Sequence, residues 1–341
     1  EFRRVLFRSG EIMDNLKKVG LTALAGSLAA ISSANAAEMS VSGATVLTYT
    51  TEDGTEVTGN PWGMKTNLGF TASGEVNGYT VSYMQTSADQ FAGMSSARLS
   101  IDMGDMGTLA FDQGSGSGLS TIDDKTPTAA EEIWDGLDTA GSSAGAKGLV
   151  GASSSGAWNY IQTLGDYTFN GSFVAGSATS NADGASSANG NGGNSWDFAI
   201  TGAAGDNLSW GFGFGDISAN TNGEDSNDHT AIFANYTAGS FTFGYSLSEI
   251  DPGLATTTAE TTNAWGIAMN VNDNLSISYG EREVEFDKAT AADVTEEGSG
   301  VAVAYTMGSI KVAGNRNEVG DNDGTAGSTD EMTEIAVSFA F

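Results

Sequence analysis

The sequence of 341 residues predicts an all-β protein, namely a 16-stranded antiparallel transmembrane β-barrel with short turns at one end and long loops at the other. The main observation is alternation, because Ile335, Val337 and Phe339 occupy one parity while Ala336 and Ser338 occupy the other. This period of two is that of a β-strand. The second observation is that the alternating segments are joined by connections that are short and long in turn, as in outer-membrane barrels.

The N-terminal segment differs from the rest and is expected to be removed. Residues 1–12 carry three Arg and match neither the composition nor the rhythm of the later segments, so we interpret them as a non-native leader. Residues 13–36 have the pattern of a signal peptide, with Lys17 and Lys18 before an apolar core of 13 residues. We expect cleavage after Ala36 and a barrel domain over residues 37–341.

Composition narrows the function classes. With no Cys and one His, the chain offers neither a disulfide scaffold nor a His- or Cys-based metal centre. The expected mature domain carries 8 basic and 40 acidic side chains, a formal charge of −32. Such a surface repels phosphate backbones, so we expect no nucleic-acid partner.

The alternating segments also indicate which face meets which environment. The large residues Trp210, Phe212 and Phe214 alternate with Gly211 and Gly213, and the same contrast recurs along the chain. A face made of Gly, Ala, Ser and Thr fits a water-filled interior, and the aromatic face then contacts outer-membrane lipid.

The connections give the strand count. Tight turns are predicted near residues 76–77, 105–106, 165–166, 206–207, 239, 273–274 and 308. Longer segments fall near residues 51–61, 87–92, 114–156, 178–193, 216–228, 251–261, 287–297 and 319–328. Seven turns and eight loops connect sixteen strands. Trp62, Trp158, Trp196 and Trp265 lie near predicted strand ends and favour an aromatic girdle at the lipid boundary over ordinary packing.

The longest connection, residues 114–156, is the candidate constriction loop, because a loop of this length in a compact fold is usually functional or disordered. Pro127 opens a predicted short helix over residues 129–134, which Gly136 ends. The loop's carboxylates would crowd a narrow aqueous passage. They are Asp123, Asp124, Glu131, Glu132 and Asp135.

Four basic residues share the parity of the predicted lumen: Lys65, Arg98, Arg282 and Lys311. Base on the wall across from acid on the loop would set a transverse field over the passage and filter solutes by charge. The alternative is that these are scattered solvated charges with no shared geometry. Arg316 falls on the outward parity.

Other motifs give little evidence for a catalytic or metal-binding site. The adjacent acids Asp123-Asp124 and Glu131-Glu132 are better interpreted as solvated charge than as general acids. Asp321–Gly324 matches half of a calcium loop but lacks its later ligands. We therefore predict no cofactor, with loosely bound divalent cations such as Ca²⁺ among the acidic loops. His229 is expected on the surface rather than in a catalytic site.

Three segments make the chain resemble the Gram-negative general diffusion porins over essentially its whole mature length. They are Ala37–Gly43, Gly107–Phe111 leading into the longest loop, and Val337–Phe341 with its C-terminal Phe. The resemblance implies the bacterial outer membrane, a homotrimer of 16-stranded barrels, and a third loop that folds inward to narrow each pore. The chain departs from the family in spreading four basic residues over distant strands where porins often have a tight Arg cluster.

These observations lead to one hypothesis and three rivals. We expect a channel, not an enzyme, that passes small hydrophilic solutes and ions by diffusion, with a preference for cations because of the net charge. A solute-selective porin would show a row of aromatics on the lumen parity, where Phe233 stands alone. An outer-membrane enzyme would depend on His229, and an adhesin or coat protein would not conduct.

Overall fold

The structure is a computed structural model, and it describes most of the expected barrel domain. The described residues are 38–53, 59–87, 94–113, 118–122, 125–137, 155–175, 193–218, 226–254 and 258–340. The leader 1–12, the signal peptide 13–36 with its cleavage site, Asp123, Asp124 and Phe341 lie outside them, so the predictions made for these residues stay predictions.

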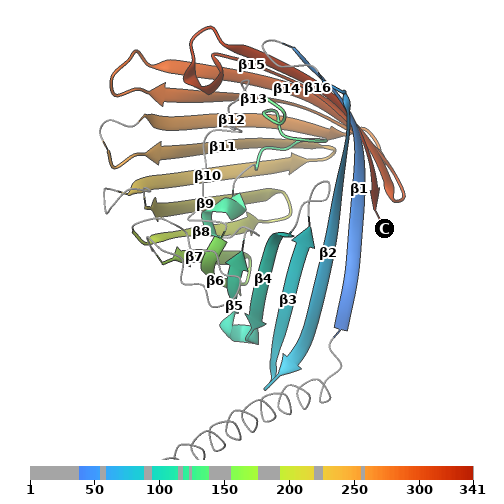
Figure 1. Cartoon of the computed structure of the whole chain (residues 1–341), viewed down its shortest axis with the longest axis vertical. Helices are drawn as coiled ribbons and strands as arrows, with labels where there is room; N and C mark the ends of the chain where they lie inside the picture. The colour runs from blue at the N-terminus through green and yellow to red at the C-terminus, as the bar shows by residue number, and fades with distance from the viewer. Residues whose placement is uncertain are drawn as a thin grey trace, which may run out of the picture.

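The described residues form sixteen strands in one closed antiparallel barrel (Figure 1). Each strand pairs with its neighbours in sequence, and β16 pairs with β1 to close the barrel. The strands are β1 (Glu38–Asp53), β2 (Trp62–Val76), β3 (Tyr79–Ser87), β4 (Met94–Asp102), β5 (Thr108–Gln113), β6 (Ser155–Leu164), β7 (Tyr167–Val174), β8 (Ser195–Ala204), β9 (Leu208–Ile217), β10 (Asn227–Ala238), β11 (Phe241–Asp251), β12 (Ala259–Asn270), β13 (Leu275–Asp287), β14 (Val294–Met307), β15 (Ile310–Gly320) and β16 (Thr329–Ala340). The predicted fold class and strand number are confirmed.

The short connections lie where the sequence predicts them, since each of the seven predicted turns falls between two consecutive strands. The first is Asn77-Gly78, with φ of 52° and 85°. Two positive φ angles in a two-residue hairpin give the twist that antiparallel strands need, and Asn and Gly adopt them most easily. At the long-loop end, β12 and β14 begin earlier than predicted, at Ala259 and Val294, so these loops are shorter than expected.

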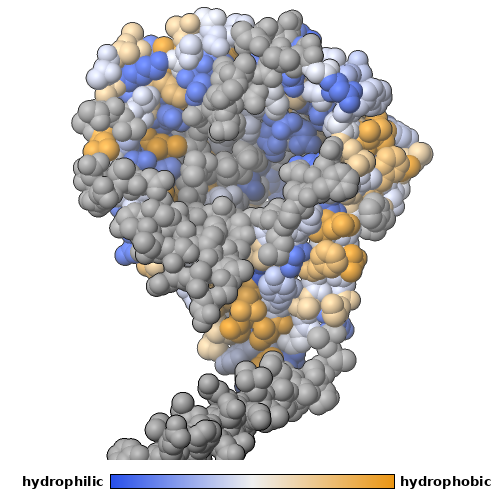
Figure 2. All heavy atoms as spheres, in the orientation of Figure 1, coloured by the Kyte–Doolittle hydropathy of each residue, from blue (hydrophilic) through white to orange (hydrophobic). Residues whose placement is uncertain are grey.

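The two faces of the sheet differ as the alternation predicts. Large apolar side chains such as Trp62, Phe243 and Ile335 are exposed on the outer face, where lipid would cover them. Figure 2 shows hydrophilic side chains inside the hollow of the barrel and hydrophobic ones at its outer edge. Trp158 and Trp196 lie near strand ends as expected, but Trp265 lies in the middle of β12.

Helical structure in the described residues is limited to the short 3₁₀ helices η1 (Gly104–Met106), η2 (Gly118–Ile122) and η3 (Asn322–Gly324). No helix among these residues is long and apolar enough to cross a membrane. The predicted helix over residues 129–134 is wrong, because only a turn over residues 133–136 forms there. The backbone of this segment bonds to the barrel wall, which leaves fewer of its polar groups for the i→i−4 bonds of a helix.

Candidate functional site

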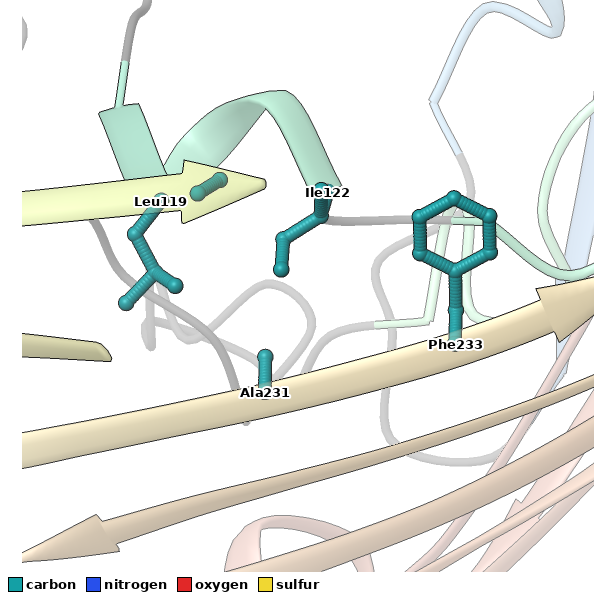
Figure 3. Packing of buried hydrophobic residues seen from close by; sticks show 5 residues of the cluster. Leu119, Ile122, Ala231 and Phe233 are labelled. Atoms are coloured by element: carbon teal, nitrogen blue, oxygen red, sulfur yellow. The ribbon is translucent and has the colours of Figure 1, made fainter. Parts of the chain in front are cut away.

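The described part of the longest loop, residues 118–122 and 125–137, lies inside the barrel along its inner wall, and η2 packs on β7 to β10. The side chains of Leu119 and Ile122, from η2, form a buried apolar cluster with Ala199, Ala231 and Phe233. In Figure 3 the side chains of Leu119 and Ile122 point from η2 toward β10, which carries Ala231 and Phe233. Fully buried Leu and Ile side chains stabilise such a contact by about 1.5–3 kcal/mol each.

Beyond η2, a row of wall glycines makes room for the loop. Gly244, Gly266, Gly280 and Gly300 lie opposite one another across β11, β12, β13 and β14. Pro127 occupies the space next to Gly244 and Gly266, where side chains would otherwise stand. Ile133 Cγ2 lies 3.2 Å from an ideal Cβ at Gly280 and 2.9 Å from one at Gly300. We name these four residues the glycine row.

Polar side chains at both ends of the glycine row bind the loop backbone. Asn235 pairs with Gly244, and its Nδ2 donates to the Lys125 carbonyl at 2.7 Å. Asn317 pairs with Gly300, and its Nδ2 donates to the carbonyls of Glu132 at 3.0 Å and Asp135 at 2.9 Å.

Two further contacts attach the loop segment 125–137 to the wall, one beside the glycine row and one past its end. The Ala129 N–H donates to Ser278 Oγ at 2.9 Å. Leu137 packs in a buried cluster with Val319 and Met332. Together, the apolar side chains and wall hydrogen bonds fix both the height and the direction of the loop.

Three of the five predicted loop carboxylates, Glu131, Glu132 and Asp135, lie close to one another on this seated segment. Glu131 is exposed, whereas Glu132 and Asp135 are half-buried. Burial raises the pKa of Asp135 to about 6, and the nearby charges of Glu131, Glu334 and Glu132 add to this effect while Lys65 opposes it. Asp135 is therefore a carboxyl whose charge changes near neutral pH.

The four predicted basic residues all lie on the lumen face, but their surroundings differ. Lys65 is exposed there and close enough to influence Asp135, and Lys311 is half-buried on β15. Arg98 Nε donates to the buried Asp112 at 2.9 Å. Arg282 is only 5% exposed and forms an ion pair with Glu296. The structure thus brings Lys65 to the loop carboxylates, and places Arg282 beneath the loop rather than on an open wall.

The wall left open by the described part of the loop is rich in hydroxyl groups. Residues 125–137 and η2 contact β7 to β16, so the lumen faces of β1 to β6 are the part of the wall that these described residues leave open. Ser40 and Thr71 are hydrogen-bonded neighbours on this wall, as are Thr86 and Ser96. A hydroxyl wall facing carboxylates is suited to the passage of hydrated cations and polar solutes.

Sequence reasoning missed two charged residues of the site. Glu334 accepts a hydrogen bond from Thr50 Oγ1 at 2.9 Å on the lumen face, and its parity in β16 was the available signal. Lys125 lines a cavity of about 350 Å³ beneath the loop with Thr128, Thr242 and Asn270. No sequence pattern marked Lys125, because its position depends on the hydrogen bond from Asn235.

The residues named for the rival functions lie elsewhere. His229 was expected on the surface, but it is 3% exposed on the lumen face of β10, so that expectation is wrong. Phe233 packs under Ile122 and does not line the passage. Within the part of the chain that the structure describes, no group of three or more His, Cys, Asp or Glu is placed to hold a metal ion.

Solved structures of outer-membrane proteins share this fold. An anion-selective porin from Comamonas acidovorans matches with a TM-score of 0.64 and 13% sequence identity, over 89% of this chain and 100% of that chain. The fold is that of the bacterial porins. A loop L8 deletion mutant of OmpT, an outer membrane protein of Vibrio cholerae, matches with a TM-score of 0.62 and 16% identity, over 90% of this chain and 100% of that chain. A mutant porin of Rh. blastica matches with a TM-score of 0.59 and 12% sequence identity, over 89% of this chain and 100% of that chain.

Sequence comparison adds no closer relative. No protein-family model matches the chain, and no curated protein is significantly similar to it. At identities of 12% to 16% the structural likeness establishes the fold and not the activity. The sixteen-stranded barrel and these neighbours indicate the bacterial outer membrane as its location.

Proposed function

We propose that the protein is an outer-membrane porin through which small hydrophilic solutes and ions diffuse passively. The observation that carries the proposal is the inserted loop, seated on the glycine row, with Glu131, Glu132 and Asp135 gathered on it inside a closed barrel. Such a loop narrows a barrel without closing it, and its charges act where the passage is narrowest. The proposed channel requires neither a reaction nor a cofactor, although loosely held divalent cations among the acidic loops stay part of the proposal.

The proposed charge preference is for cations. The carboxylates near the loop outnumber the one wall amine beside them, Lys65, and the expected mature domain carries a net charge of −32. The neighbour from Comamonas acidovorans is an anion-selective porin, so charge preference does not follow from the fold. It must come from the residues at the constriction.

The proposed assembly is a homotrimer with the short turns in the periplasm and the long loops outside the cell. A trimer form is known for the OmpT neighbour of Vibrio cholerae. The outer face of this barrel is apolar on β1 to β4, where Val41, Phe70 and Leu99 are exposed, and so suits either lipid or a second copy.

Single-channel recording tests the proposal. The purified mature protein is inserted into a planar bilayer, and its unitary conductance and its reversal potential are recorded under a KCl gradient. We expect stable conductance steps with a reversal potential displaced toward that of K⁺. A folded, heat-modifiable barrel that gave no steps would contradict the channel and favour an adhesin or coat protein.

Two further measurements separate the remaining rivals. A solute-selective porin of the same fold would show current block that saturates with one solute class, whereas a general channel would show permeation graded by size. An enzyme would lose a measurable hydrolysis on His229→Ala. Because His229 is buried in the lumen wall, we expect this variant to conduct with unchanged charge preference.

A further inference from the structure

The lumen face of β13 carries contacts from two inserted loops, one after the other along the strand. Ser278 and Gly280 contact the constriction loop through Ala129 and Ile133. Four residues beyond Arg282, Phe286 contacts the eighth long loop, residues 321–328, where an ideal Cβ at Gly324 would lie 2.8 Å from its ring. Arg282 lies between these two sets of contacts and faces the same side.

Arg282 connects the two loops through its own contacts. Its guanidinium carbon lies 5.2 Å from the ring centroid of Trp134, which belongs to the constriction loop. Its NH2 nitrogen lies 3.2 Å from Glu296 Oε1, and both side chains are almost completely buried. The other carboxylate oxygen, Glu296 Oε2, accepts the N–H of Asp323 in the eighth loop at 2.8 Å.

A buried ion pair of this kind is sensitive to what surrounds it. Taking two charges out of water is costly, and the pair persists only while additional contacts satisfy its remaining groups. Stacking on Trp134 satisfies one face of the guanidinium, and the Asp323 N–H satisfies one oxygen of Glu296. Loss of either loop contact therefore weakens the pair, and a weaker pair holds the other loop less firmly.

We propose that Arg282 is a positioning residue that couples the eighth loop to the constriction loop, so that displacement of the eighth loop alters the opening of the channel. The consequence for conduction rests on the proposed function, whereas the coupling between the loops does not. The eighth loop has a second attachment, since Lys288 Nζ donates to the Gly324 carbonyl. Loss of the Arg282 link would therefore loosen this loop without releasing it completely.

A thiol reporter tests the coupling without any need for conduction. The chain has no Cys, and Asn322 in η3 is 5% exposed, so Asn322→Cys reports undocking of the eighth loop by its rate of maleimide modification. We expect Trp134→Leu to accelerate modification at position 322 by about fivefold or more, although Trp134 belongs to the other loop. Trp196→Leu, which removes an indole from the lipid-facing side, should leave the rate unchanged.

The role of the ion pair is tested in a background that keeps the fold. Replacing Arg282 and Glu296 together by Met removes both charges and leaves neither one buried alone. In that background Trp134→Leu should no longer affect the rate at position 322. The exposed pair Arg316 and Glu331, replaced in the same way, is the matched control and should preserve the effect. Should the buried Met pair fail to give a heat-modifiable barrel, Arg282→Lys keeps the charge, loses the planar stacking face, and should show a reduced effect.

Two results would overturn the proposal. One is an unchanged rate at position 322 when Trp134→Leu is introduced into a folded barrel. The other is an equal acceleration with and without the Arg282–Glu296 pair. In bilayers, attaching a bulky maleimide at position 322 should shift the unitary conductance when Arg282 is present and not in the Met pair. A parent protein that never conducts would contradict the proposed function and leave the thiol comparison to decide the coupling.

Discussion

At the residue scale, the carboxyl of Asp135 on the constriction loop changes its charge near neutral pH. Burial raises the pKa of Asp135 to about 6, with Glu131, Glu334 and Glu132 adding to the effect. Below that pH the carboxyl is neutral, and above it the passage gains one negative charge. Because the folded protein binds this proton more tightly than the unfolded chain, Asp135 also favours the folded state at low pH, and this contribution is lost as the pH rises from about 4 to about 6.

We therefore predict that cation preference depends on pH through Asp135. Under a KCl gradient, the reversal potential should lie closer to that of K⁺ at pH 7.5 than at pH 5. The Asp135→Asn variant should show the pH 5 value at both pH values, apart from smaller changes caused by other groups. A wild-type step between pH 5 and 7.5 that persists undiminished in Asp135→Asn would assign the titration to another residue.

Strand parity predicted the side of each basic residue but not its neighbours. Lys65, Arg98, Arg282 and Lys311 all lie on the lumen face, as their positions in the alternating segments indicate. Whether such a charge faces the passage depends on residues distant in sequence. Trp134 covers Arg282 from the inserted loop, and the partner of Arg98 is on the next strand. No local pattern carries that information, because the third loop is placed by contacts across the barrel.

At the element scale, the position of the constriction loop is set by wall residues that lack side chains. The glycine row runs across four neighbouring strands, and a single Cβ in it meets Pro127 or Ile133. The sequence showed that small residues share the lumen parity, but their alignment into a row appears only once the register of β11 to β14 is known. The same loop explains the wrong helix prediction, because its polar backbone groups bond to Asn235, Ser278 and Asn317.

Two glycines on one strand give a matched test of this arrangement. An ideal Cβ at Gly300 would meet Asn317 Oδ1, which belongs to a side chain that binds the loop, and would lie 2.9 Å from Ile133 Cγ2, whereas at Gly298 the nearest atom is 3.7 Å away. Both residues face the lumen from β14, two positions apart. We predict that Gly300→Ala destabilises the seated loop by about 1–3 kcal/mol through overpacking. Gly298→Ala should be neutral or slightly stabilising.

The two variants, Gly300→Ala and Gly298→Ala, are compared by single-channel conductance and by urea unfolding of the heat-modifiable form. Gly300→Ala should change the unitary conductance and increase the open-channel noise, while Gly298→Ala should match the parent in both. Equal behaviour of the two variants would mean that the glycine row does not position the loop.

At the scale of the whole molecule, the net charge overstates the field inside the channel. Several carboxylates lie on the outer face of β13 to β16, where they line a groove of about 700 Å³. They include Glu281, Glu283, Glu297 and Glu318. Composition predicted an acidic protein correctly but did not separate these residues from those of the lumen. That separation requires the barrel register, which assigns every strand residue to one face.

Measurements of ion selectivity at different salt concentrations distinguish the effect of the lumen carboxylates from that of the carboxylates on the outer face. At 1 M salt the Debye length is about 3 Å, so only charges at the constriction itself act on a passing ion, whereas at 0.1 M it is about 10 Å and more distant charges contribute. We predict that changing Glu131, Glu132, Asp135 and Glu334 to amides abolishes cation preference at 1 M KCl. The matched control changes the same number of charges on the outer face, Glu281, Glu283, Glu297 and Glu318, and should keep the parent reversal potential at 1 M. An equal loss in both variants would show that the preference arises from total charge and not from the loop.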